Sequence, residues 1–186
     1  MKLSEHKDLK EALILMPVKE KDKLLLRLIA KDKILTEHLH FKLLETEIDL
    51  EGRKEAIADE IKKIVDNIEQ VSYRDALYYL RQLTTSINHF FKITKDVYGE
   101  AELKVLLLNS MPILFNSPHY RGKDFGFQFA VYFVKSADAV VKKVQKLHED
   151  LKFDLAEDVN KMLKKIYDSH LAKGAEYIQL PTELGS

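Results

Sequence analysis

Apolar residues recur every three or four positions along most of this 186-residue chain, with charged residues between them. This is the period of an α-helix with one buried side, whereas a half-buried strand alternates at every second position. Only six Gly and four Pro interrupt the pattern, and these are the residues that most often end helices. The sequence therefore predicts an all-α fold.

The periodic stretches predict seven or eight helices of uneven length, joined by short turns. They cover approximately residues 7–16, 18–30, 34–44, 50–68, 72–94, 100–111, 124–150 and 154–174. Such helices pack as antiparallel hairpins, either in a bundle or in a short, irregular helix-hairpin stack of the solenoid type. Both arrangements stay open here because the sequence has no fixed repeat period.

The segment 124–134 is ambiguous when taken alone. Phe125, Phe127 and Phe129 alternate with smaller residues, which is the pattern of a strand. The apolar residues then continue at steps of three or four as far as Leu151. This continuation favours one long helix over 124–150, with a local strand as the alternative.

We expect a single helical domain over residues 1–176. The most loop-like stretch is 116–123, where Asn-Ser-Pro is followed by Arg-Gly-Lys. A soft joint is possible there, although division at that point would leave a small second part. Residues 177–186 are expected to form a loose C-terminal tail.

Charge and composition exclude several classes of protein. The chain has 30 Lys and Arg, 30 Asp and Glu, and no Cys. Disulfide scaffolds, cysteine-ligated zinc sites and thiol catalysis are therefore excluded, and a reducing, cytoplasmic location is expected. The longest stretch without charge, 105–120, is shorter than the roughly 20 residues that span a bilayer. We expect no membrane partner.

No sequence motif predicts a cofactor or a catalytic residue. Glycine-rich phosphate loops and the Gly-x-Ser-x-Gly elbow do not occur. The strongest metal candidates are Glu37 and His40, which stand at the Glu-x-x-His spacing of di-iron helical bundles. Such sites need a second copy of the motif, and the sequence has none. A helical metal protein or hydrolase with a site near Glu37 and His40 is kept as an alternative function.

Lysines follow one another along the last two long helices and define a second alternative, nucleic-acid binding. Lys142, Lys146, Lys161 and Lys165 would form a basic strip that follows phosphates. Interspersed acids such as Asp138 and Asp158 dilute this strip, and lysine-rich faces are common on soluble helices. Nucleic acid is therefore an unlikely partner on this sequence.

The aromatic residues give the favoured interpretation. Phe127 cannot share a helix face with Phe125, Phe129 and Phe133, and Tyr79 lies beside the apolar stripe of its helix. Exposed aromatic patches commonly mark protein interfaces. With Tyr120 of the 116–123 loop, Tyr79 and Phe127 are the candidate partner-binding residues. The sequence thus favours a non-catalytic helical interaction or scaffold protein, which binds a protein partner or itself.

Overall fold

The computed structural model describes residues 5–68, 70–117 and 122–185, and within these ranges the chain forms nine α-helices. They are α1 (Lys7–Leu15), α2 (Val18–Ile29), α3 (Lys33–Leu44), α4 (Glu47–Val65), α5 (Tyr73–Thr94), α6 (Val97–Ser110), α7 (Phe125–Val144), α8 (Glu149–Tyr167) and α9 (Ala172–Tyr177). The all-α class is confirmed. The short α9 accounts for the one helix beyond the expected eight.

The chain divides into two compact units, residues 1–45 and 46–186. The described residues of the first unit form no buried core. The single domain expected over 1–176 stays a prediction. The expected joint at 116–123 lies partly outside the described residues.

The N-terminal unit contains α1, α2 and α3, and none of its described residues is buried. Polar contacts close its helix ends. The Lys21 ammonium donates to the carbonyl of Ile14 at 2.7 Å, and the Thr36 hydroxyl donates to that of Ile29 at 2.8 Å. These contacts satisfy carbonyls that a helix end leaves free, without burying apolar surface.

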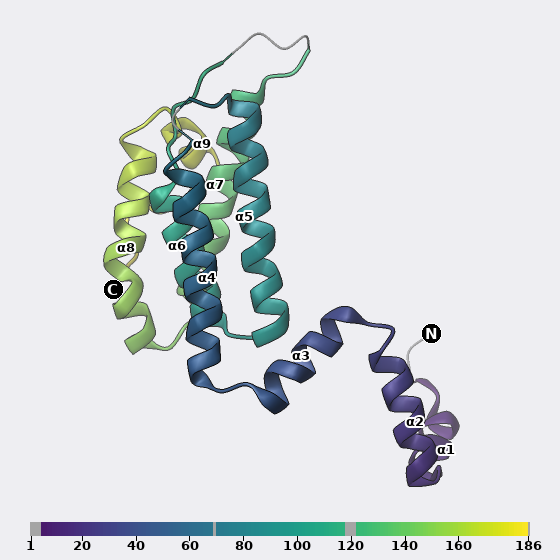
Figure 1. The fold of residues 1–186 in the computed structure, drawn as a ribbon. Coiled ribbons are helices and arrows are strands. Elements are labelled where there is room, and N and C mark those ends of the chain that lie inside the picture. The colour runs from purple at the N-terminus through teal and green to yellow at the C-terminus, as the bar shows by residue number, and fades with distance from the viewer. Residues whose placement is uncertain (1–4, 69, 118–121, 186) are drawn as a thin grey trace. The chain divides into compact units, whose positions relative to one another are not determined.

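The second unit is a bundle in which α6 is central and contacts α4, α5, α7 and α8 (Figure 1). Its sequence explains this position, because apolar residues occur on several sides of the helix. Leu103, Val105, Leu107 and Leu108 are all buried. A helix that is apolar on all sides must be surrounded by other elements.

An aromatic cluster joins α5 and α7 to the segment that follows α6. The Tyr73 and Phe115 rings lie 5.5 Å apart edge to face, and Phe115 lies 5.3 Å from Phe129. Phe133 continues the cluster at 5.8 Å from Phe129. The alternation of phenylalanines therefore belongs to a helix, which settles the ambiguity of residues 124–134 in favour of α7.

The long helix expected over 124–150 ends earlier, at Val144. Residues 145–148 tighten into a turn, in which the Leu147 amide donates to the Val144 carbonyl at 3.0 Å. Leu147 packs against the core from this turn, and α8 then begins at Glu149. The apolar spacing of the sequence continues past Val144 because the turn and α8 also bury apolar residues against the core.

The C-terminal segment packs on the bundle, in contrast to the loose tail expected for 177–186. Leu180 and Leu184 are buried. The Leu184 amide donates to Oδ1 of Asn160 at 2.7 Å, and the Tyr167 hydroxyl donates to the Leu180 carbonyl. The two buried leucines and the two hydrogen bonds with α8 hold this segment against the bundle.

Candidate functional site

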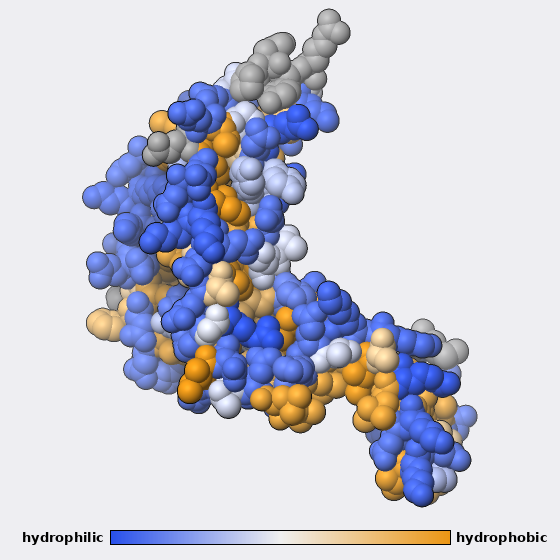
Figure 2. Space-filling model, in the orientation of Figure 1, coloured by the Kyte–Doolittle hydropathy of each residue, from blue (hydrophilic) through white to orange (hydrophobic). Residues whose placement is uncertain are grey.

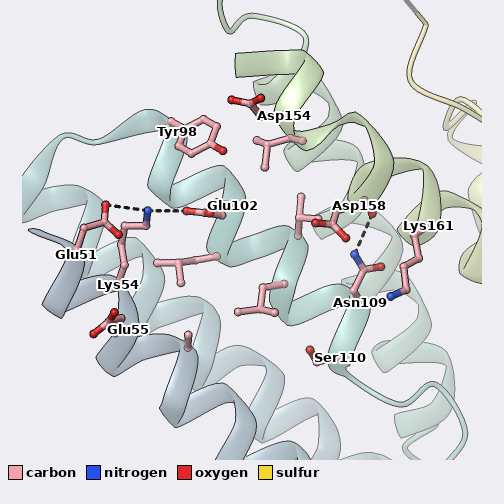
Figure 3. A pocket seen from close by; sticks show the side chains of 15 residues that line it. Glu51, Lys54, Glu55, Tyr98, Glu102, Asn109, Ser110, Asp154, Asp158 and Lys161 are labelled. Atoms are coloured by element: carbon pink, nitrogen blue, oxygen red, sulfur yellow. Dashed lines mark hydrogen bonds and ion pairs between the residues drawn. The ribbon is translucent and has the colours of Figure 1, made fainter. Parts of the chain in front are cut away.

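The larger of two notable surface grooves in the bundle lies over α6, between α4 and α8, and has a volume of about 590 Å³ (Figure 3). Its floor is apolar, with Leu103 and Leu106 of α6. Its walls carry the carboxylates Glu51 and Glu55 of α4, Glu102 of α6, and Asp154 and Asp158 of α8, together with Lys54 and Lys161. Acids outnumber bases, so this groove attracts cations.

Lys54 links Glu51 of α4 to Glu102 of α6 (Figure 3). Its ammonium lies 2.8 Å from Glu102 and 3.2 Å from Glu51. Burial of Lys54 opposes its charge, but hydrogen bonds to Glu102 and Glu51 and attraction from both carboxylates outweigh this and raise the pKa of Lys54. This lysine therefore stays charged and neutralises part of the acidic wall.

Tyr98 and Asn109 mark opposite ends of the same groove (Figure 3). Burial, with added repulsion from Glu102 and Asp154, raises the pKa of the Tyr98 hydroxyl, which therefore remains protonated near neutrality. Asn109 donates to the Asp158 carbonyl at 2.9 Å, and its buried Oδ1 accepts no hydrogen bond from the described residues. No histidine lines this groove.

The second groove, of about 570 Å³, lies between α7 and α9 and is mainly apolar. Phe127 and Tyr177 stand at its edges with exposed fractions of 66% and 89%. Val131 and Val134 of α7 and Leu171 and Ile178 beside α9 lie between them. Lys135, Lys173 and His170 add cationic or titratable groups, and no acid lines the groove.

Glu37 and His40 each lie beside a different partner. Glu37 lies 3.8 Å from the Lys33 ammonium, whereas Nδ1 of His40 lies 2.9 Å from the Glu45 carboxylate. Throughout residues 5–68, 70–117 and 122–185, no three His, Asp and Glu side chains are grouped so as to hold a metal ion. The alternative of a metal protein or hydrolase gains no support from this placement.

The three aromatic candidates fall in different places. Phe127 is on the edge of the α7/α9 groove, and Tyr120 lies outside the described residues. Tyr79 is half-buried against the core, while its neighbour Tyr78 is 64% exposed, with the two rings 5.6 Å apart edge to face. On α5, Tyr78 therefore offers more aromatic surface than Tyr79.

The four candidate lysines do not form one basic strip. Lys142 pairs with Asp138 at 2.7 Å, Lys146 is exposed, and Lys161 lines the acidic groove. Lys165 points to the C-terminal end of α6, where its ammonium donates to three carbonyls: Leu108 at 2.9 Å, Asn109 at 2.8 Å and Met111 at 2.5 Å. The nucleic-acid alternative loses Lys165 as a phosphate contact.

Sequence reasoning missed this capping role of Lys165. Desolvation by burial, with a smaller repulsion from Lys161, lowers the pKa of Lys165 to about 8. A cation at a helix C-terminus interacts favourably with the free carbonyls there. The contacts join residues more than fifty positions apart, so no local pattern pointed to them.

Comparison of the chain with protein-family models, curated proteins and solved structures finds no match. Among the described residues, no helix has both the length and the apolar character needed to cross a membrane.

Proposed function

We propose that this chain is a non-catalytic helical protein-interaction protein that self-associates through α1, α2 and α3. The observation that carries the proposal is the state of the N-terminal unit, in which no residue from 5 to 45 is buried. A cytoplasmic location is part of the proposal and rests on the cysteine-free sequence.

The exposed apolar surface is concentrated in this unit. Ten of the eighteen exposed large apolar side chains among the described residues belong to it: Leu9, Ile14, Leu15, Val18, Leu25, Leu26, Leu28, Leu35, Leu43 and Leu44. Figure 2 shows apolar side chains open to solvent on these helices. Contiguous apolar surface of this kind is removed from water when a partner covers it.

The helices are also too short to be stable alone. α1 has 9 residues, and α2 and α3 have 12 each. Isolated helices of fewer than about 12 to 15 residues are marginal in water and need burial of an apolar face. Since the unit does not provide that burial internally, an association partner supplies it.

The charges of the unit favour a second copy as that partner. Residues 5–45 carry nine Lys and Arg and eight Asp and Glu, interspersed along the segment. A two-fold interface brings the same surface together from both copies, so it must be complementary to itself. A nearly neutral, mixed-charge surface meets this requirement, whereas a surface of one sign would repel its own copy.

The test is analytical ultracentrifugation of the full chain across a range of concentrations. The variant Leu25→Gln/Leu28→Gln removes two exposed leucines from one side of α2, and Lys19→Gln/Lys23→Gln is the matched control on the opposite side. Gln preserves helix propensity in both. We expect the leucine variant to be monomeric and the lysine variant to associate like the wild type.

A monomeric wild type at every concentration would contradict self-association. Equal association by both variants would show that another surface mediates it. Circular dichroism of each variant controls for loss of helical structure.

A further inference from the structure

The groove between α7 and α9 has the geometry of a receptor for a helix. Val131 and Val134 follow Phe127 along α7 at spacings of four and seven residues, and all three line the groove. With Phe127 exposed, Val131 half-buried and Val134 only 3% exposed, they form an apolar ridge of about 10 Å, given 1.5 Å of rise per residue. Residues at this spacing are the ones that pack between the side chains of a neighbouring helix.

The opposite wall comes from α9 and the residues beside it. Leu171, Tyr177 and Ile178 line this side. α9 lies close to α7 at Gly174, where a Cβ would lie 3.7 Å from Cγ2 of Val134, an ordinary van der Waals distance. The groove is therefore a shallow apolar channel with an exposed aromatic ring on each side.

The charged groups of the channel have one sign. Lys135 and Lys173 are exposed at its edge, and neither forms an ion pair with another described residue. Glu176, the acid of α9, does not line the channel. It lies near Tyr167, where burial, followed by repulsion from Glu176, raises the pKa of the tyrosine hydroxyl. The unbalanced charge is therefore positive.

We propose that the α7/α9 groove binds an amphipathic helix of another protein, with an apolar stripe at the spacing of Phe127, Val131 and Val134 and with acidic residues beside it. The apolar stripe would cover the ridge, and the acids would pair with Lys135 and Lys173. This proposal concerns a surface other than α1–α3 and does not depend on self-association.

Charge argues against occupation by this chain itself. Two α7/α9 grooves placed face to face would bring Lys135 and Lys173 of both copies together. The most amphipathic segment of the N-terminal unit, α2, carries Lys19, Lys21, Lys23 and Arg27 against Glu20 and Asp22. A net basic helix does not complement a channel with a basic edge.

The test is a fluorescence-anisotropy titration of the full chain in its Leu25→Gln/Leu28→Gln form, so that self-association does not affect the result. The probe is a labelled synthetic helix of about 15 residues, with leucines at the ridge spacing and glutamates on both sides. A second probe has lysines in place of the glutamates. We expect saturable binding of the acidic probe and at least about tenfold weaker binding of the basic one.

Two matched pairs of variants locate the site. Phe127→Ser should weaken binding of the acidic probe by about tenfold or more, whereas Phe153→Ser, at an 83% exposed phenylalanine of α8, should not. Lys135→Gln/Lys173→Gln should weaken binding and reduce its salt dependence, and Lys164→Gln on α8 should have no effect.

Three results with the helical probes would overturn the proposal. They are equal affinity for both probes, unchanged affinity of the acidic probe for the Phe127→Ser variant, and no binding at chain concentrations up to the millimolar range. Preferential binding of a fluorescent long-chain fatty acid, abolished by Phe127→Ser, would also overturn it and make the groove a lipid site.

Discussion

The ammonium of Lys143 on α7 pairs with the carboxylate of Glu100, which lies in the first turn of α6 and is 4% exposed. Lys104 approaches the other oxygen of the same carboxylate at 2.6 Å. The Lys143 ammonium also lies 4.6 Å from the centre of the Phe91 ring of α5. One buried acid thus joins three helices of the bundle.

Replacing this acid should destabilise the bundle strongly. Glu100→Ala leaves two partly buried ammonium groups without their partner, and we expect a loss of about 3 kcal/mol in the free energy of unfolding. Glu102→Ala on the same helix is the control, because Glu102 is more exposed and its loss should cost at most about 1 kcal/mol. Chemical denaturation of both variants measures the difference, and equal losses would contradict it.

Two glycine-to-alanine substitutions should have opposite signs. The Gly99 amide donates to Asp96 at 2.9 Å, which caps α6, and a Cβ on Gly99 would collide with that carboxylate. Gly99→Ala should therefore cost about 1 kcal/mol through the lost cap. Gly52→Ala in the middle of α4 meets no atom within 4 Å and should stabilise by about 0.5 kcal/mol. Thermal unfolding of the two proteins tests the pair.

Lys165 should titrate close to pH 8. In the unfolded chain the Lys165 ammonium has the ordinary pKa of 10.5, and in the folded chain its pKa is about 8. The unfolded state binds more protons between these values, so raising the pH through this window stabilises the folded state. The free energy of unfolding of the wild type, relative to Lys165→Met, should rise from pH 8 to 10. A flat difference, or an NMR titration of Lys165 above pH 10, would contradict this.

Hydrogen exchange should depend on concentration in the N-terminal helices alone. If association buries α1, α2 and α3, their amides should be protected at high concentration and should exchange rapidly on dilution. The amides of α6, which lies at the centre of the bundle, should stay protected throughout and provide an internal control. Exchange in α1–α3 that is equally slow at all concentrations would show that these helices need no partner.

The C-terminal segment should contribute to stability. Leu180→Ala removes a fully packed side chain and should cost about 2 kcal/mol. Glu183→Ala, at an exposed position of the same segment, should be nearly neutral. Urea unfolding distinguishes the two, and a neutral Leu180→Ala would mean that the segment behaves as a loose tail.

Local patterns in the sequence predicted the helices well, because amphipathic spacing and capping residues act within a few positions. Ser72 caps α5 through the Asp75 amide at 3.3 Å, as the spacing of Ser and Asp indicates. The sequence predicts the start of α6 at Glu100, three residues late, since the polar residues of α6 are spread around the helix and no polar side marks where it begins after the cap Asp96.

The sites were less predictable, because they depend on contacts between distant segments. Phe127 is exposed as expected from its angle on α7, which is a property of one helix. Tyr79 is less exposed than Tyr78 because α5 contacts α4, α6 and α7 and so buries a wide arc. The association of Lys165 with the end of α6, and of Lys54 with Glu102, is set by tertiary packing alone.

The central position of α6 has a consequence for how sequences of this kind can diverge. On α4 and α8, substitutions accepted over time should recur with the helical period, since one side of each helix faces solvent. α6 is contacted by four helices, and Asp96 and Lys165 cap its two ends. Few residues of α6 can therefore be replaced without loss of stability. Among descendants of a common ancestor, α6 should form an uninterrupted block of slowly changing residues.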